Sequence, residues 1–359
     1  MRISHLILKD FRNYQSCDLK FSHQICVLVG DNAQGKTNLL ESIYFLSNAR
    51  LFRSSDEKAC IRFNQEFALI KAQLDHDIHL KVVVHPKGKT LFVQNQILKK
   101  TSEFVGRLNA VLFSPSDLDL FEASPKARRY LIDVELGKIN PTYMHYLSHY
   151  NRTLKERNAL LKETKLDHTY LELLTRQLID DQKILIPIRK IFVSQLNDEI
   201  IKIFPKLSLV NNTVHMRLIG ISEEDDLEES LVKRYEKSLE RDVLFKQTHV
   251  GIHRDDLHFT LDDQEVSEVA SQGQKRMFVI AIKAALVNVI TTYTHERPVL
   301  LLDDVFSELD AKRREALYLF LHNQGQTIIT STDEESIEPW LKEKVQFIDV
   351  VEGKIVERS

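Results

Sequence analysis

The chain has 359 residues, 43% of which are hydrophobic, and a formal net charge of −3. This length and apolar content can supply two or three separate cores, and the small net charge does not by itself indicate a nucleic-acid partner. No apolar run is long enough to span a membrane, and residues 1–6 are too polar for a secretory signal. Three cysteines without a close pair favour a reduced, cytoplasmic protein with no membrane partner.

The first part of the chain, residues 1–113, is expected to be rich in strands. Residues 3–8 alternate apolar and polar side chains, as a half-buried strand does, and residues 25–29 form one continuous apolar run. The other expected strands of this region are 68–72, 79–85 and 90–94. Together these segments predict an antiparallel β subdomain attached to a phosphate-binding core.

Residues 30–37 match the pattern G-x-x-x-x-G-K-T of a phosphate-binding loop, the Walker A motif. The loop follows an apolar run and precedes a segment of helical periodicity, which is the strand–loop–helix context that this motif requires. We predict that its backbone amides bind ATP phosphates, that Lys36 contacts the outer phosphates, and that the Thr37 hydroxyl holds Mg²⁺. The predicted ATP-binding residues of the loop are Gly30, Asp31, Asn32, Ala33, Gln34, Gly35, Lys36 and Thr37.

Residues 114–245 are dominated by helical periodicity and predict a helical second lobe. The expected helices are 125–137, 141–164 and 168–203, with a further helix starting in the acidic stretch 222–229. Pro187 is expected to kink or break the third helix, because proline lacks the backbone N–H that a helix interior uses. This lobe would be inserted between two parts of one ATPase lobe, residues 1–113 and 246–359.

The last part of the chain returns to an α/β pattern. Residues 299–302 form an apolar run typical of a central parallel strand, a helix is expected at 311–320, and another strand at 327–330. Asp303 and Asp304 follow the first strand, as carboxylates do in a Walker B motif. We predict that Asp303 holds Mg²⁺ and that Asp304 orients or deprotonates the attacking water; an acidic turn is the alternative.

Two further short motifs stand in the order found in ABC-type ATPases. Ser271, Gly273 and Gln274 match the signature S-x-G-Q, and residues 307–310 match the S-x-L-D loop that follows Walker B. The fold class expected from these four motifs is α/β, a P-loop NTPase of the ABC-ATPase head type. In ABC-type enzymes the signature closes over ATP bound to a second copy, so the resemblance implies an ATP-dependent homodimer.

Motifs along nearly the whole chain resemble the RecF family of bacterial DNA replication and repair proteins. The segments that carry this resemblance are Asp10–Tyr14, Gly30–Glu41, Phe113–Pro115, Pro125–Asp133 and Gly251–Leu257, followed by the signature and Walker B. The resemblance implies a weak, DNA-dependent ATPase that binds single-stranded or gapped DNA junctions. It also implies partnership with RecO and RecR in loading RecA and support of the SOS response. As in related heads, Arg12, Asn13 and Tyr14 are expected to contact the base or ribose of ATP, with a plain turn after the first strand as the alternative.

Several alternatives stay open at this stage. The energy-supplying subunit of an ABC transporter shares the ATP motifs, whereas a phosphotransferase would not explain Ser271, Gly273 and Gln274. Arg128 and Arg129 are the preferred DNA-phosphate contacts, and salt bridges to Asp133 or Glu135 are the competing interpretation. His249 and His253 are four residues apart, but Gly251 between them argues against a helical metal pair and for a polar network.

Overall fold

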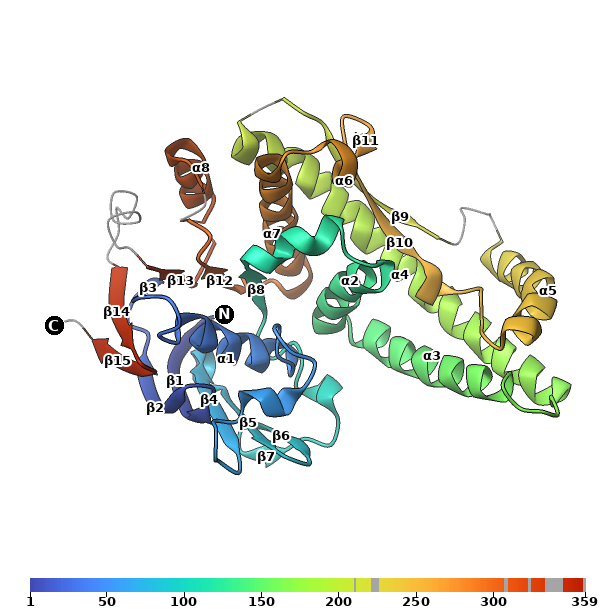
Figure 1. Cartoon of the computed structure of the whole chain (residues 1–359), viewed down its shortest axis with the longest axis horizontal. Coiled ribbons are helices and arrows are strands. Elements are labelled where there is room, and N and C mark those ends of the chain that lie inside the picture. Colours follow the sequence, from blue (N-terminus) through green and yellow to red (C-terminus); the bar gives the residue numbers. More distant parts are fainter. Residues whose placement is uncertain (210, 221–225, 307–308, 322–323, 333–344, 358–359) are drawn as a thin grey trace. The chain divides into compact units, whose positions relative to one another are not determined.

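The computed structural model describes residues 1–209, 211–220, 226–306, 309–321, 324–332 and 345–357 (Figure 1). The chain forms two compact units. Unit 1 consists of Met1–Leu118, Lys202–Asn211 and Gln272–Ser359, and unit 2 consists of Asp119–Ile201 and Asn212–Ser271. The second unit therefore extends to Ser271, whereas the sequence pattern suggested a helical lobe that ends at residue 245.

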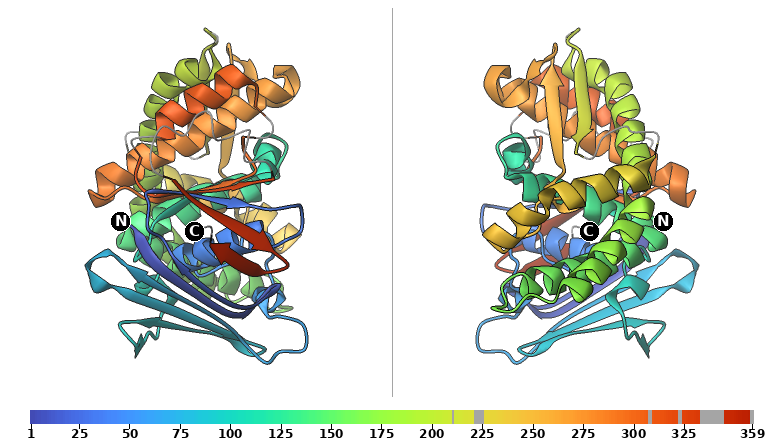
Figure 2. Two further views of the ribbon diagram at one scale, coloured as in Figure 1. Left: turned by 90° about the vertical axis from the view of Figure 1, so that its left-hand side faces the viewer. Right: turned by 90° about the vertical axis from the view of Figure 1, so that its right-hand side faces the viewer.

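Unit 1 contains an antiparallel six-stranded sheet, visible as the blue and teal strands in Figure 2. The strands in spatial order are β2 (Tyr14–Lys20), β1 (Ile3–Phe11), β4 (Ala68–Leu74), β5 (His79–His85), β6 (Gly88–Val93) and β7 (Gln96–Ile97). Inward side chains alternate with outward ones along each strand, so that one face enters the core and the other meets solvent. The predicted antiparallel subdomain is confirmed.

A second six-stranded sheet of unit 1 is mainly parallel. Its spatial order is β15 (Lys354–Glu357), β14 (Val345–Val351), β3 (Ile25–Val29), β13 (Thr327–Ser331), β12 (Val299–Asp303) and β8 (Ala110–Phe113). The N-terminal and C-terminal segments of the chain thus share one sheet, because β3 pairs with both β13 and β14. This arrangement brings the ends of β3 and β12 to the same edge, where the two Walker motifs lie.

Helix α1 (Lys36–Asn48) is buried almost all round and contributes to one core with both sheets of unit 1. Leu39, Ile43 and Leu46 on this helix are fully buried. Because nearly every face of α1 is buried, its sequence has no extended polar face. The same burial fixes the start of the helix against the parallel sheet. The loop that precedes Lys36 is therefore anchored at both ends.

Helix α7 (Gln272–Thr294) is long and apolar. Its length and composition alone would allow it to cross a membrane, with a mean hydropathy of 1.6 over the most apolar window, but 72% of that window is buried inside the fold. The core helix of a soluble protein has the same composition, and α7 packs against β8. Helix α8 (Ala311–Leu321) follows β12 in the same unit.

Unit 2 combines helices with a small sheet that the sequence did not predict. The helices are α2 (Pro125–Ile139), α3 (Pro141–Leu160), α4 (His168–Ser208), α5 (Leu227–Phe245) and α6 (Val266–Val269), and the last residues of α4 belong to unit 1. The sheet is antiparallel, in the order β11 (Gln264–Glu265), β10 (Asp256–Leu261) and β9 (Val214–Ile219). Strand β9 lies within the range that we expected to be helical, and pairing with the distant β10 stabilises it.

Helix α4 is not broken at Pro187, where the sequence predicted a kink or a break. The helix runs without interruption over 41 residues. Proline removes one backbone hydrogen bond, but Leu185, Ile186 and Phe192 on either side of it are buried, and their packing outweighs that loss. The starts of α2 and α3 agree with their sequence signals, since the Ser124 and Asn140 side chains accept backbone N–H bonds before Pro125 and Pro141.

Candidate nucleotide site

The Walker A loop has a backbone that only glycine fits at two positions. Gly30 has a φ of +155° and Gly35 a φ of +121°. A Cβ on Gly30 would lie 2.4 Å from the carbonyl oxygen of Val350, and one on Gly35 would lie 2.7 Å from Nδ2 of Asn13. Residues from both ends of the chain therefore pack closely against the loop and restrict its conformation between β3 and α1.

The Lys36 side chain points into the loop. Its Nζ donates to the backbone oxygen of Asp31 at 2.8 Å and also to that of Gly30. Burial lowers the pKa of Lys36, and the carboxylates of Asp304, Asp303 and Asp31 oppose that shift. An ammonium group that is desolvated and held by carbonyl oxygens interacts strongly with phosphate oxygens that take their place.

Thr37 and Asp303 meet at the edge of the parallel sheet. The Thr37 hydroxyl donates to Asp303 Oδ1 at 2.7 Å, and the Thr330 hydroxyl donates to the same oxygen at 3.0 Å. Burial raises the pKa of Asp303, and these two hydrogen bonds act in the opposite direction. The predicted Mg²⁺ ligands, one from each Walker motif, are thus brought together across 266 residues of sequence.

Asp304 has an unusual backbone conformation that Thr330 supports. Its φ is +51°, a left-handed value that aspartate tolerates better than most residues. The Asp304 N–H donates to the Thr330 hydroxyl at 2.9 Å, so the threonine on β13 holds both Walker B residues. The geometry gives this hydroxyl a positioning role toward the two carboxylates.

A cleft of about 670 Å³ lies beside the loop and is lined by polar side chains that include Arg12, Asn13, Asn38 and Arg53. Arg12 Nε donates to Glu41 at 2.8 Å, and its Nη1 donates to the Ala59 oxygen at 2.7 Å. Burial would raise the pKa of Glu41, but hydrogen bonds from Arg53 and Arg12 outweigh this and lower it. Arg12 is thus held by a buried carboxylate at the wall of the cleft, where a nucleoside would be within reach.

Comparisons with known proteins agree with this architecture. A family model described as the RecF/RecN/SMC N terminal domain matches residues 2–355. The DNA replication and repair protein RecF of Ligilactobacillus salivarius is 35% identical over 372 residues, covering 100% of this chain and 98% of that protein. The chain belongs to the RecF family. A role in DNA replication and repair follows from this membership, and the transporter alternative is not favoured.

Solved structures show the fold of the RecF family directly. One described as the recombination mediator protein RecF with ATP in the RecFOR pathway has a TM-score of 0.91 and 29% identity, covering 99% of both chains. An Smc head domain from Pyrococcus furiosus has a TM-score of 0.58 and 18% identity, covering 100% of this chain and 96% of that one. The fold is that of an ABC-ATPase head, as the motif order predicted.

The loop in this RecF-family chain is supported by contacts that sequence reasoning missed. Asn13 Nδ2 donates to the Gln34 backbone oxygen at 2.9 Å, and the Gly353 N–H donates to the same oxygen at 2.9 Å. The Glu352 N–H donates to Gln34 Oε1 at 2.6 Å. The β1–β2 and β14–β15 turns thereby hold one residue of the loop from two sides. Only the presence of Asn13 within a family-like segment hinted at this role.

Replacing Asn13 with alanine should weaken ATP binding by roughly 2- to 12-fold, because one neutral hydrogen bond contributes about 0.5–1.5 kcal/mol. The substitution removes the bond from Asn13 to the Gln34 backbone oxygen and the bond from Asn38 to Asn13 Oδ1, and it leaves the residues of the loop itself unchanged. Titration with a fluorescent ATP analogue measures the change. Asn151→Ala, at an exposed asparagine of α3, is the control for loss of a surface amide, and equal effects of the two variants would contradict a positioning role for Asn13.

The signature residues occupy the N-terminal end of α7. Ser271 precedes the helix and is exposed, while Gly273 and Gln274 lie in its first turn and are partly exposed. A serine, a glycine and the backbone amides of a helix start can form an anion-binding surface. Of the S-x-L-D loop, Ser307 and Glu308 lie outside the described residues, and Asp310 accepts a bond from the Arg313 N–H at 3.0 Å.

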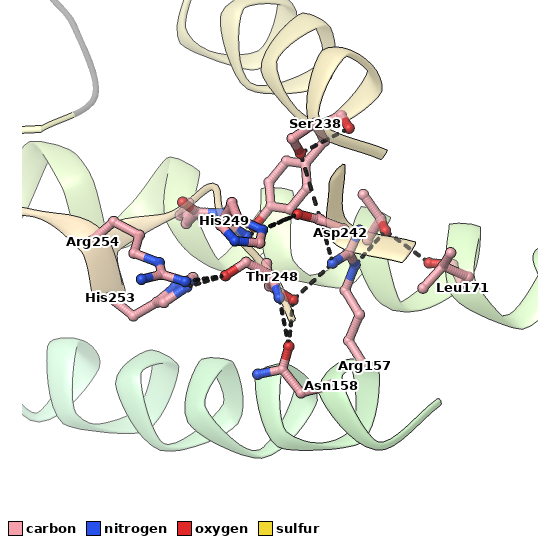
Figure 3. A network of polar contacts seen from close by, with 12 residues as sticks. Arg157, Asn158, Leu171, Ser238, Asp242, Thr248, His249, His253 and Arg254 are labelled. Carbon is pink, nitrogen blue, oxygen red and sulfur yellow. Dashed lines mark hydrogen bonds and ion pairs between the residues drawn. The ribbon is translucent and has the colours of Figure 1, made fainter. Parts of the chain in front are cut away.

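His249 and His253 belong to a buried polar network (Figure 3). His249 Nδ1 lies 2.9 Å from Asp242, which also accepts a bond from Arg157 at 2.8 Å, and His253 Nε2 lies 3.1 Å from the Thr248 oxygen. Burial lowers the pKa of His253 to about 4, so the ring is neutral at physiological pH. No cluster of metal-binding side chains occurs in the described ranges.

Arg128 and Arg129, the preferred DNA contacts from the sequence, are engaged within unit 2. Arg128 makes a two-bond salt bridge to Asp256 at 2.8 and 2.7 Å, and Arg129 donates to the backbone oxygen of Asp255. The competing interpretation, salt bridging, fits this geometry better, although the partners are not the expected Asp133 and Glu135. Asp133 instead pairs with the buried Arg189 at 2.6 Å. These arginines stabilise the junction of α2 with β10.

Proposed function

We propose that this RecF-family chain binds ATP at the loop of unit 1 and acts as an ATP-gated, DNA-binding dimer in recombinational repair. The observation that carries the proposal is the 2.7 Å hydrogen bond between Thr37 and Asp303, which joins the Walker A and Walker B motifs in one place. The RecF structure solved with ATP, similar over 99% of the chain, supports the same ligand here.

The residues around the loop suit a nucleoside triphosphate with Mg²⁺. Backbone amides at the start of α1 and the Lys36 ammonium would bind phosphate oxygens, and Arg12 would contact the nucleoside in the adjacent cleft. The oxygens of Thr37 and Asp303 are the hard ligands that Mg²⁺ prefers, and the bound ion would offset the charge of the phosphates. These two protein oxygens leave the remaining positions to phosphate and water.

Hydrolysis of ATP to ADP and phosphate would depend on Asp304. Its carboxylate follows the Walker B strand and is held in position through its own backbone N–H. From this place it would orient or deprotonate the attacking water. Aspartate is one methylene shorter than the glutamate usual in transport ATPases, so the proposed enzyme is a weak ATPase whose turnover is slow enough to keep the ATP state populated.

Pairing of two copies would use the signature at the start of α7. Ser271, Gly273 and Gln274 of one copy would cover ATP bound at the loop of the other, so that hydrolysis releases the pair. The proposed DNA ligands are single-stranded and gapped duplex junctions, and the proposed partners are RecO, RecR and RecA in the cytoplasm, with support of the SOS response. The similar ATP-bound structure is that of a recombination mediator in the RecFOR pathway, which supports these partners.

Sedimentation of the purified chain tests the dimer and the DNA ligand together. The chain alone and with ADP should sediment as a monomer, and with ATP as a dimer. Gapped DNA added with ATP should shift the dimer to a faster complex, whereas blunt duplex should shift it less. Identical profiles with ATP and ADP would contradict the ATP gate.

Replacing Ser271 with arginine should separate ATP binding from pairing. The large cation at the start of α7 would block the contact with a second copy, while the loop of the same chain keeps its ligands. We expect ATP affinity to change less than about 2-fold and the ATP-dependent dimer to disappear in sedimentation, with hydrolysis abolished in parallel. A loss of hydrolysis with pairing intact would show that Ser271 does not act across the dimer.

A further inference from the structure

The outward face of the antiparallel sheet in unit 1 is strongly biased toward positive charge. Lys20, Lys9, Lys71 and Lys81 lie on it, on the adjacent strands β2, β1, β4 and β5. Strands β4 to β7 contain no carboxylate at all, and Asp18 on β2 is the outward carboxylate of the sheet. The whole chain has more acidic than basic residues, 52 against 49, so this bias is local. We call this surface the lysine face.

Two lysines of the lysine face lie directly opposite each other. Lys71 on β4 is the register partner of Lys81 on β5. Like charges in directly opposed positions destabilise a sheet. Among the residues that the structure describes, Lys9, Lys71 and Lys81 form no ion pair with a carboxylate. Neither Lys71 nor Lys81 therefore has an ion pair within the described residues that would offset their mutual repulsion.

Aromatic rings partly support the lysines of the face. The Lys81 ammonium lies 3.7 Å from the centre of the Phe92 ring, and that of Lys9 lies 5.5 Å from the centre of Phe67. A cation over an aromatic ring keeps its charge available on the other side. Ile7, the register partner of Lys71, and Leu69, the register partner of Lys9, are only half-buried. The face combines fixed cations with exposed apolar surface.

We propose that the lysine face binds the phosphate backbone of DNA. Phosphate oxygens would relieve the repulsion between Lys71 and Lys81, and the sugars would pack on the apolar side chains beside the lysines. The proposal rests on the proposed function, since it supplies the surface for DNA. The proposed DNA surface and the nucleotide cleft are also close in sequence, because Lys9 is three residues before Arg12, which lines the cleft.

The test compares two triple variants of the full chain with equal loss of charge. K9Q/K71Q/K81Q alters the lysine face, and K162Q/K165Q/K237Q alters exposed lysines of unit 2. Affinity for single-stranded and gapped duplex DNA is measured with ATP at salt concentrations from about 50 to about 200 mM. The binding constant falls as salt rises, and each phosphate contact that is removed makes the slope of log K against log salt less steep by about 0.7–0.9. We expect K9Q/K71Q/K81Q to bind DNA at least about tenfold more weakly, with a slope less steep by about two to three. We expect K162Q/K165Q/K237Q to bind DNA as the unchanged chain does.

Stability gives an independent readout. Lys71→Gln alone relieves the repulsion with Lys81, so the melting temperature should stay the same or rise while DNA binding weakens. Weaker binding with a lower melting temperature would mean that Lys71 acts through the fold and would overturn the proposal.

The remaining outcomes separate this proposal from the proposed function. If the unchanged chain binds DNA and K9Q/K71Q/K81Q binds equally well with the same slope, the lysine face is not the DNA surface, although the repair function stands. An equal loss in both triple variants would show only a general effect of charge and would also overturn the proposal. If the unchanged chain binds no DNA with ATP, the proposed function fails as well.

Discussion

Replacing Lys36 with alanine should weaken ATP binding by about 100-fold or more and abolish ATP-dependent pairing. Hydrogen bonds to charged groups contribute about 1.5–3 kcal/mol each, and a 100-fold loss corresponds to about 2.7 kcal/mol. The effect is large because Lys36 is buried inside the loop and is the loop's own cation. Calorimetric titration with ATP measures the affinity, and sedimentation with ATP measures pairing.

Lys99→Ala is the matched control for the Lys36 variant, because Lys99 is an exposed lysine of the same unit. It should leave ATP binding and pairing unchanged. The melting temperature of the Lys36 variant without nucleotide should stay close to that of the unchanged chain, since the substitution removes only two bonds to the loop's own carbonyls. Tight ATP binding by Lys36→Ala would contradict the assignment of residues 30–37 as the phosphate-binding loop.

The motifs of the nucleotide site could be located from sequence because each depends on local geometry. A loop that must turn sharply between a strand and a helix requires Gly30 and Gly35 at fixed spacing, and the carboxylates that follow β12 require a buried apolar strand. The contact between Thr37 and Asp303 was expected from the motif types, but its geometry depends on the sheet. It exists because β13 lies between β3 and β12, so the ends of both strands face the same edge.

The parts that sequence did not predict depend on distant contacts. Gln34 is held by Asn13 and by the turn at Gly353, which are separated by almost the whole chain. Strand β9 is too short to stand out among helical segments until it pairs with β10. Helix α4 continues through Pro187 because packing outweighs one missing hydrogen bond, a balance that propensity alone cannot reveal. Tertiary packing decided each of these features.

Replacing Asp304 with asparagine should slow ATP hydrolysis by roughly 100- to 10,000-fold, the usual contribution of a general base, while ATP still binds. Asparagine keeps the size of the side chain and tolerates the left-handed backbone at this position, where φ is +51°. The N–H bond to Thr330 does not involve the carboxylate and should persist. The variant therefore removes the acid–base function with little change in structure.

The ATP-bound dimer should accumulate in Asp304→Asn, because release depends on hydrolysis in the proposed cycle. Single-turnover hydrolysis with labelled ATP measures the chemical step, and sedimentation after incubation with ATP measures the dimer. Asp263→Asn is the matched control: it is the same substitution at an exposed aspartate that also has a left-handed backbone, with φ +62°, but lies in unit 2, so its hydrolysis rate should not change. If Asp304→Asn hydrolysed ATP at the unchanged rate, another group would have to activate the water. If hydrolysis stopped but the dimer failed to accumulate, ATP would not be what holds the two copies together.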